Sequence, residues 1–313
     1  ILTWWISTER EVALRSGANM SDWAIRAGHT SEIFDFPSDI HRFLQRYQAS
    51  ILAKNFPTKN LRKHEENHPK FDLVIPMFHG IYGEDGQITA FLKTLGCKYA
   101  YSDFEVHTLC IDKYQTNLFL KKYNINIPKP EIIQKNQKPK KINSDLLFPL
   151  IVKPNKWWSS IWISRVKNIS ELESAIKLII NDDILIQSCI EWREFTVWVY
   201  FDASWFHALP IIEIKTLSQD FFDYEEKYET DGSNEVFLEW ENELQLLLKT
   251  ESERIASILG CSGIIRIDYR YDWTDIYFLE VNTIPGFTSG SLVPKMWKKA
   301  GKSEGEFVEI ISI

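Results

Sequence analysis

Two apolar segments near the carboxyl end carry polar side chains at alternate positions, and this pattern constrains the fold more than any other feature of the chain. Arg266 and Asp268 lie in the first segment, and Glu280 and Asn282 lie in the second. Residues two apart on a strand point to the same face. The stretch Asp272–Asp275 between the segments is typical of a hairpin turn. We therefore expect two paired strands that present these four side chains on one face.

Carboxylate and amide oxygens gathered on one face have a specific chemical use. They are hard ligands of the kind that Mg²⁺ takes in proteins. The loop that follows contains Pro285, Gly286 and Gly290, and glycine allows a backbone to approach a ligand closely. Each short pattern alone is better explained by a half-buried sheet whose polar residues face water. The combination favours a metal site.

The composition is that of an ordinary globular protein with two or three lobes. The 313 residues are 44% hydrophobic and 25% charged, and the net charge is −7 at pH 7. This acidic balance argues against nucleic acid or a membrane surface as a partner, and no apolar run approaches the roughly 18 residues of a membrane span. The four cysteines lie far apart without metal-ligand spacing, which fits reduced thiols in the cytoplasm. The first residues resemble no signal peptide.

Residues 1–100 alternate between strand-like and helical patterns, which predicts an α/β lobe with a parallel sheet. We expect a strand over Ile1–Trp5, a helix from Ser7, a buried strand over Phe71–Phe78 and a helix that ends at Leu95. The glycine-rich stretch His79–Gly86 follows the buried strand. Ligands of parallel sheets gather beyond the carboxyl ends of the strands, so this loop is expected to line a cleft.

The rest of the chain predicts two further lobes of mixed helices and strands. We expect helices over Asp112–Tyr123, Ser170–Ile180, Leu244–Leu259 and Met296–Ile313, and strands over Phe148–Pro154, Asp183–Ile190 and Glu191–Val199. The strand that ends at Lys153 precedes a Ser-Ser loop, which is a suitable place to bind phosphates. The charged and aromatic segment 221–228 has few periodic apolar positions and is typical of an exposed loop.

The Arg-x-Asp pattern, followed by Glu-x-Asn-Thr-x-Pro-Gly, resembles the metal-binding strands of ATP-grasp ligases. The continuation Phe287-Thr-Ser-Gly-Ser-Leu-Val-Pro294 is similar to that of the D-alanine–D-alanine ligase family. The resemblance extends over nearly the whole chain. It implies an α/β ATP-grasp fold of three lobes: a parallel α/β substrate lobe over 1–101, a central lid over 102–187, and a carboxyl-terminal lobe over 188–313 with the metal and substrate site.

The same resemblance implies roles for residues in all three lobes. The implied catalytic residues are Glu9, Ser159, Tyr228, Arg266 and Gly286. Substrate contacts are implied for Glu9, His79, Ser291 and Leu292. The implied ATP-binding residues are Lys113, Lys153, Glu194 and Lys227, and the implied metal ligands are Asp268, Glu280 and Asn282.

The resemblance also implies a reaction. The chain would join two D-alanines with ATP, through an acylphosphate, for peptidoglycan synthesis in the cytoplasm, with two Mg²⁺ or Mn²⁺ ions as cofactors and a homodimer as a common family state. Two alternatives stay open: a related ligase that takes D-lactate as its second substrate, and a degenerate paralogue without activity. Tyr228 favours the dipeptide enzyme. Gln187 stands where the family commonly has a carboxylate, which we interpret as a minor variation because an amide still forms hydrogen bonds.

Tryptophan stands at several positions where the family has glycine. These positions are Trp4, Trp5, Trp158, Trp162, Trp192, Trp198 and Trp273. An indole fills space that a phosphate-binding loop needs, and overpacking costs roughly 1–3 kcal/mol per site. The 12 tryptophans and 13 glycines of the chain together match ordinary glycine usage of about 7%. We hypothesise that the source reads UGA as glycine, whereas the printed translation reads it as tryptophan. Real tryptophans would instead favour the degenerate paralogue.

Overall fold

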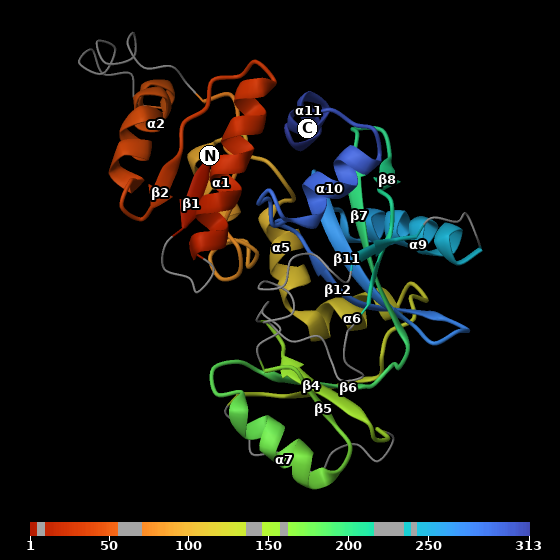
Figure 1. Cartoon of the computed structure of the whole chain (residues 1–313). Coiled ribbons are helices and arrows are strands. Elements are labelled where there is room, and N and C mark those ends of the chain that lie inside the picture. Colours follow the sequence, from red (N-terminus) through yellow and green to blue (C-terminus); the bar gives the residue numbers. More distant parts are fainter. Residues whose placement is uncertain (5–9, 56–70, 136–145, 157–161, 216–234, 239–242) are drawn as a thin grey trace.

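The computed structural model describes the chain except for residues 5–9, 56–70, 136–145, 157–161, 216–234 and 239–242. Figure 1 shows three groups of elements, an amino-terminal group in red and orange, a central group in green, and a carboxyl-terminal group in blue. The mixed α/β architecture with three lobes is the one that the sequence predicts.

The amino-terminal lobe is built on two parallel strands. The strands are β1 (Leu2–Trp4) and β2 (Phe34–Phe36), and the helices are α1 (Arg10–Arg26), α2 (Ile40–Asn55) and α4 (Gln87–Leu95). The prediction of a regular strand over Phe71–Phe78 is wrong. The segment is largely buried but pairs only through isolated bridges at Val74 and Pro76. Proline lacks a backbone N–H, so a regular ladder of hydrogen bonds cannot pass through Pro76.

The described residues of the central lobe form an antiparallel sheet with one helix packed on it. Within the described residues the strand order is β3–β6–β4–β5, with bounds Pro130–Ile133, Ile184–Ser188, Leu150–Pro154 and Ser164–Val166. Helix α7 (Ile169–Leu178) begins after the cap Asn168, whose side chain accepts from the N–H of Glu171. Its buried side chains Leu172 and Ala175 complete the core of this lobe. This arrangement confirms the expected strands and helix.

A larger antiparallel sheet forms the carboxyl-terminal lobe. The described strands run in the order β10 (Glu235–Phe237), β9 (Ile212–Ile214), β7 (Arg193–Phe201), β11 (Ile264–Tyr271) and β12 (Ile276–Asn282), and β8 (Phe206–Ala208) also pairs with β7. Helix α9 (Glu243–Leu259) packs on one face of this sheet. Helices α10 (Leu292–Lys299) and α11 (Glu304–Ile311) cover the other. The single closing helix expected over Met296–Ile313 is wrong, because the chain turns at Gly301 with a φ of 73°.

Two helices connect the lobes. Helices α5 (Phe104–Ile111) and α6 (Lys113–Lys121) begin the segment that we assigned to the central lid, but they contact β12 and share the core of the carboxyl-terminal lobe. Figure 1 shows them between the green sheet and the blue one. The side chain of Asp112 accepts from the N–H of Gln115 and thereby fixes the first turn of α6. Lys113 therefore enters the space between the two sheets from a capped helix end.

The amino-terminal lobe packs on the carboxyl-terminal one. Helix α1 contacts α11, and the Trp23 ring lies edge-on to Phe287 and Phe307, with centroid distances of 4.8 and 5.4 Å. At the rim, Arg26 forms an ion pair with Glu304. Within the described residues, no helix combines the length and the apolar character that crossing a membrane requires.

Candidate active site

Strands β11 and β12 pair in the register that the sequence pattern predicts. Asp268 lies opposite Glu280, and Arg266 lies opposite Asn282. Side chains directly opposite each other on paired strands lie on one face of the sheet. The structure therefore brings the four expected side chains together.

A β-bulge lies within this pair of strands. Tyr269 pairs with Phe278, whereas its neighbour Asp268 pairs with Glu280, so Leu279 is the extra residue. Phe278 and Tyr269 consequently point into the core under α9, although Phe278 is only two residues from Glu280. Bulges re-aim side chains next to functional sites. Here the bulge allows a full apolar core on one face while Glu280 joins Asp268 on the other.

Asp268 is held by two neighbours on the sheet. Its Oδ1 accepts a hydrogen bond from Thr196 Oγ1 at 2.7 Å, across the pairing of β7 with β11. Both of its oxygens lie 3.1 Å from Nε of Arg266, and Nη2 of Arg266 lies 3.0 Å from Oδ2. Because both side chains are largely buried, this contact fixes the orientation of the guanidinium group on the face of the sheet.

Two buried lysines converge on Glu280 from different elements. Lys113 Nζ and Lys153 Nζ lie 3.8 and 3.9 Å from Oε2 of Glu280. Lys113 comes from the start of α6, and Lys153 comes from β4 in the central sheet. The central and carboxyl-terminal lobes of the sequence prediction thus both contribute to one small volume in which a single carboxylate faces two ammonium groups.

Burial makes this cluster attractive to an anion. Burial lowers the pKa of Lys153 to about 8, nearby Lys113 lowers it further, and the carboxylates of Glu280, Glu194 and Asp268 oppose the shift. A buried ammonium group is favoured when an anion compensates its charge. A bound phosphate would supply that compensation.

Asn155 connects the two lysines. Its backbone carbonyl accepts from the backbone N–H of Lys113 at 3.3 Å, and its Oδ1 accepts from the N–H of Tyr114 at 2.9 Å. Its Nδ2 donates to Oδ1 of the cap residue Asp112 at 2.8 Å. Since Asn155 follows Lys153 by two residues, these bonds tie the start of α6 to the end of β4. The sequence contained a signal for this role, namely a polar side chain directly after the strand, but we did not single it out.

Asn282 offers an oxygen without a partner. Its Oδ1 is buried and has no hydrogen-bond partner among the described residues. A buried polar atom of this kind is costly unless a ligand satisfies it. Together with Asp268 and Glu280 it forms a set of hard oxygen donors that fits Mg²⁺. These three residues are the ones that could hold the metal.

The amino-terminal lobe contacts the loop that follows β12. Nε2 of His79 lies 3.2 Å from Oγ of Ser16, and the same hydroxyl accepts from the N–H of Phe287 at 3.0 Å. Asn19 donates to the carbonyl of Phe287 at 2.9 Å. Burial lowers the pKa of His79 to about 4, so its imidazole is neutral at pH 7. Two hydrogen bonds from α1 therefore hold the backbone next to Gly286.

Ser291 lies at the start of α10 and stabilises the same loop. Its Oγ accepts from the N–H of Thr288 at 2.9 Å and lies 2.8 Å from the hydroxyl of Thr288. Leu292 is the first residue of α10 and packs partly against the core under that helix. The expected substrate residues His79, Ser291 and Leu292 are thus all on or beside one loop.

Some of the remaining expected residues are described by the structure, and the others lie outside the described residues. Glu194 is bonded to Arg270 across the β7–β11 pair at 2.6 Å. Gln187 is buried, and its Nε2 lies 3.5 Å from Oδ1 of Asn117, a helix α6 residue whose Nδ2 donates to the carbonyl of Lys113. The expected residues Glu9, Ser159, Lys227 and Tyr228 lie outside the described residues, as do Trp5 and Trp158.

Comparison with known families gives a match to one family model over most of the chain. Residues 116–312 match the model described as D-ala D-ala ligase C-terminus. Among curated proteins, the chain is 32% identical to D-alanine–D-alanine ligase of Thermotoga petrophila, over 98% of this chain and 93% of that protein. It is also 32% identical to the enzyme of the same name from Coprothermobacter proteolyticus, over 97% of this chain and 94% of that one.

Solved structures agree with the sequence comparison. The structure resembles D-alanine–D-alanine ligase from Bacillus anthracis complexed with ATP, with a TM-score of 0.78, 25% identity and coverage of 99% of this chain and 94% of that one. It also resembles the ligase from Coxiella burnetii, with a TM-score of 0.77 and 99% and 92% coverage. At 20% identity the second likeness shows the fold alone.

Proposed function

The chain belongs to the D-alanine–D-alanine ligase family, and we propose that it joins two D-alanines with ATP through an acylphosphate at the face shared by β11 and β12. The observation that carries this proposal is the convergence of Lys113 and Lys153 on Glu280, with Asp268 directly opposite on the paired strand. We further propose that the reaction supplies peptidoglycan synthesis in the cytoplasm and that the enzyme is a homodimer.

The lysines and the metal-ligand residues have different roles in binding ATP. Lys113 and Lys153 bind the phosphate chain and neutralise the charge that spreads over the transferred group. Asp268, Glu280 and Asn282 would hold two Mg²⁺ or Mn²⁺ ions. When bound, these ions would supply Lewis-acid chemistry that neutralises phosphate oxygens. Glu194 contributes to the ATP site from β7.

The first step transfers the terminal phosphoryl group. The carboxylate of the first D-alanine attacks the γ-phosphorus, the bond from that phosphorus to the bridging oxygen of ADP breaks, and an acylphosphate forms. Such transfer depends on positioning and on charge neutralisation rather than on a protein nucleophile. Glu9 binds the ammonium of the first D-alanine, with His79 beside it, and Lys227 approaches the γ-phosphate.

The second step forms the peptide bond. The amine of the second D-alanine attacks the acyl carbon, a tetrahedral oxyanion develops, and phosphate leaves as the carbonyl re-forms and the attacking nitrogen loses a proton. Arg266, oriented by its bonds to Asp268, and the backbone N–H of Gly286 stabilise that oxyanion. Ser291 and the backbone at Leu292 bind the carboxylate of the second substrate. Ser159 and Tyr228 are assigned to the same site by the family resemblance, and exclusion of water from the site would protect the acylphosphate from hydrolysis.

Phosphate release tests the proposal. Purified enzyme with Mg²⁺ and ATP is expected to release one phosphate for each D-alanyl-D-alanine formed, and to release almost none without D-alanine. D-lactate offered as the second substrate with limiting D-alanine distinguishes the dipeptide enzyme from the depsipeptide one. Absence of D-alanine-dependent phosphate release from a folded protein that contains glycine at the family's glycine positions would contradict the proposal.

A further inference from the structure

Three exposed tryptophans share a backbone conformation that large side chains avoid. Among the described residues, seven positions other than glycine have positive φ, and three of them are Trp162, Trp192 and Trp273, with φ of 72°, 97° and 75°. Crowding of Cβ against the neighbouring carbonyl disfavours this region for L-residues, and glycine alone enters it without that cost. Each of the three positions therefore has a backbone geometry suited to glycine.

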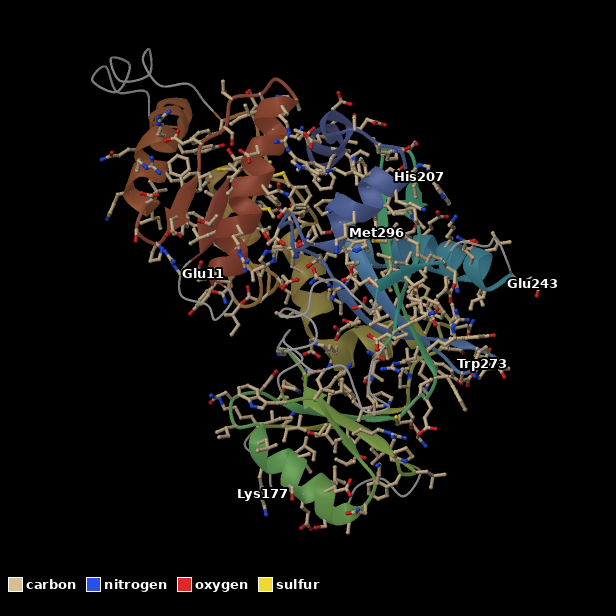
Figure 2. All side chains as sticks on the ribbon, viewed as in Figure 1. Glu11, Lys177, His207, Glu243, Trp273 and Met296 are labelled. Carbon is tan, nitrogen blue, oxygen red and sulfur yellow. The ribbon has the colours of Figure 1, made fainter. Side chains whose placement is uncertain are left out.

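Their side chains contribute little to the core. Trp162, Trp192 and Trp273 are 43%, 65% and 59% exposed. Figure 2 shows Trp273 at the outer tip of the β11–β12 hairpin, away from the packed centre of the molecule. No burial of an indole in the core offsets the backbone conformation at these positions.

Two other tryptophans have the opposite environment. Trp23 and Trp297 are 2% and 0% exposed, and both rings lie edge-on to Phe307. The indole N–H of Trp297 donates to the carbonyl of Ser303 at 2.6 Å. Neither residue is among those with positive φ. The backbone and packing of both residues, and the hydrogen bond of Trp297, are those expected of genuine tryptophans.

An interaction surface is the competing interpretation of the exposed rings. The Trp192 and Trp273 rings lie 6.3 Å apart, and the guanidinium group of Arg193 lies 5.7 Å from the Trp273 ring centroid. Exposed aromatic groups often mark docking sites. However, Trp162 precedes β5 in the central lobe, whereas the other two border the carboxyl-terminal sheet. A single docking patch therefore does not explain why all three share the left-handed conformation.

We propose that the native protein carries glycine at positions 162, 192 and 273 and tryptophan at positions 23 and 297, because its source reads UGA as glycine and UGG as tryptophan. The structure thus divides these five tryptophans into two classes, rather than assigning all of them to one codon. The proposal concerns translation and backbone geometry, so it stands or falls independently of the ligase activity.

Peptide mass spectrometry of the protein purified from its source, together with the codons at the five positions, tests this proposal. We expect glycine encoded by UGA at 162, 192 and 273, and tryptophan encoded by UGG at 23 and 297. Tryptophan at any of the first three positions in the native peptides, or glycine at either of the last two, overturns it.

A recombinant comparison provides a second test. The protein with tryptophan at all five positions is compared with the variants Trp192→Gly and Trp273→Gly. Each of these two variants is expected to raise the unfolding midpoint by about 2–4 °C. The control Trp297→Gly is expected to lower the unfolding midpoint by more than about 2–4 °C. If Trp297→Gly does not fold, Trp297→Phe, which retains an aromatic ring, serves as the control instead. A lower midpoint for both Trp192→Gly and Trp273→Gly contradicts the proposed backbone assignment.

Discussion

The buried amide oxygen of Asn282 is the residue-scale feature that most directly indicates a metal. It lies on the face of Asp268 and Glu280 and has no hydrogen-bond partner among the described residues. Replacing Asn282 with alanine removes a ligand without adding charge. We expect Asn282→Ala to raise the Mg²⁺ concentration for half-maximal activity by roughly tenfold or more, while Asn282→Asp retains a ligand oxygen.

A nearby asparagine serves as the matched control for that prediction. Asn19 also lies beside the loop after β12, where it donates to the carbonyl of Phe287, but it is not among the proposed metal ligands. Asn19→Ala is expected to lower stability and to leave the Mg²⁺ requirement unchanged. Equal changes in Mg²⁺ requirement for Asn19→Ala and Asn282→Ala would argue against a metal at Asn282.

Two buried histidines predict how stability depends on pH. Burial lowers the pKa of both His79 and His107 to about 4, below the unfolded value of about 6.5. The unfolded chain therefore binds these protons first, and the free energy of unfolding falls as the pH falls from about 6.5 to 4. Each histidine adds up to about 1.4 kcal/mol per pH unit in this range.

Urea unfolding between pH 4 and 7 measures that dependence. His79→Gln is expected to reduce the slope of the unfolding free energy against pH, because one of the two buried imidazoles is removed. His29→Gln, at an exposed position, is the control for a histidine-to-glutamine substitution outside the core. A slope that is the same in His79→Gln and in the unaltered protein would contradict the assignment.

At the scale of elements, a hydrogen bond between α5 and the residue that follows β12 positions the metal-binding strand. Nδ1 of His107 lies 2.6 Å from Oγ1 of Thr283, both residues are fully buried, and Thr283 directly follows Asn282. Removing one partner leaves a buried polar atom unpaired. A double-mutant cycle of His107→Phe and Thr283→Val, followed by urea unfolding, is expected to give a coupling energy of roughly 1 kcal/mol. A coupling energy near zero would show that the two side chains act independently.

The contact of α6 with β4 makes a separate prediction about ATP. The Asn155 side chain bonds to the N–H of Tyr114 and to Asp112, and Asn155→Ala removes both bonds, so it should displace Lys113 from Lys153. We expect a KM for ATP that is roughly tenfold higher, with a smaller change in the KM for D-alanine. Steady-state kinetics measures both values.

The control for Asn155 is the next residue along the chain. Lys156 is exposed and forms an ion pair of 3.4 Å with Asp112, and exposed pairs contribute little. Lys156→Ala should therefore leave the KM for ATP almost unchanged. If Lys156→Ala raises that KM as much as Asn155→Ala does, charge near Asp112 rather than the hydrogen bonds of Asn155 is responsible.

Sequence periodicity could predict which strands carry the site, because alternation on a strand is a local property. Asp268, Glu280 and Asn282 follow that rule, and the structure pairs them as expected. The bulge at Leu279 could not be predicted, since it depends on core packing of Phe278 under α9. The contact of α5 and α6 with β12 could not be predicted either, because it joins residues more than 150 positions apart.

The difference between local patterns and long-range contacts also explains which predictions from the sequence were wrong. The segment Phe71–Phe78 has the apolar composition of a strand, but Pro76 limits its pairing to isolated bridges. The carboxyl-terminal helix is divided at Gly301, whose positive φ the surrounding periodicity did not indicate. The role of Asn155 depends on a partner helix that precedes it by about 40 positions, and no local pattern reports such a contact.

At the scale of the whole molecule, the site is assembled from the joints between the lobes. The central sheet supplies Lys153, the connecting helix supplies Lys113, the large sheet supplies Glu280, and α1 holds the loop beside Gly286. A change in the relative placement of the central and carboxyl-terminal lobes would alter the distance from Lys153 to Glu280, whereas Lys113 lies on a helix that shares the carboxyl-terminal core and would stay near Glu280.

The measurement that tests the account most directly is the turnover of Glu280→Gln, which keeps the shape of the side chain and removes the charge that both lysines face. With Mg²⁺, ATP and D-alanine, we expect D-alanyl-D-alanine formation to fall by roughly a hundredfold or more, while urea unfolding shows a protein that is still folded. The background is the chain with glycine at the family's glycine positions. Near-normal dipeptide formation by a folded Glu280→Gln enzyme would contradict the claim that this carboxylate and its two lysines form the centre of the active site.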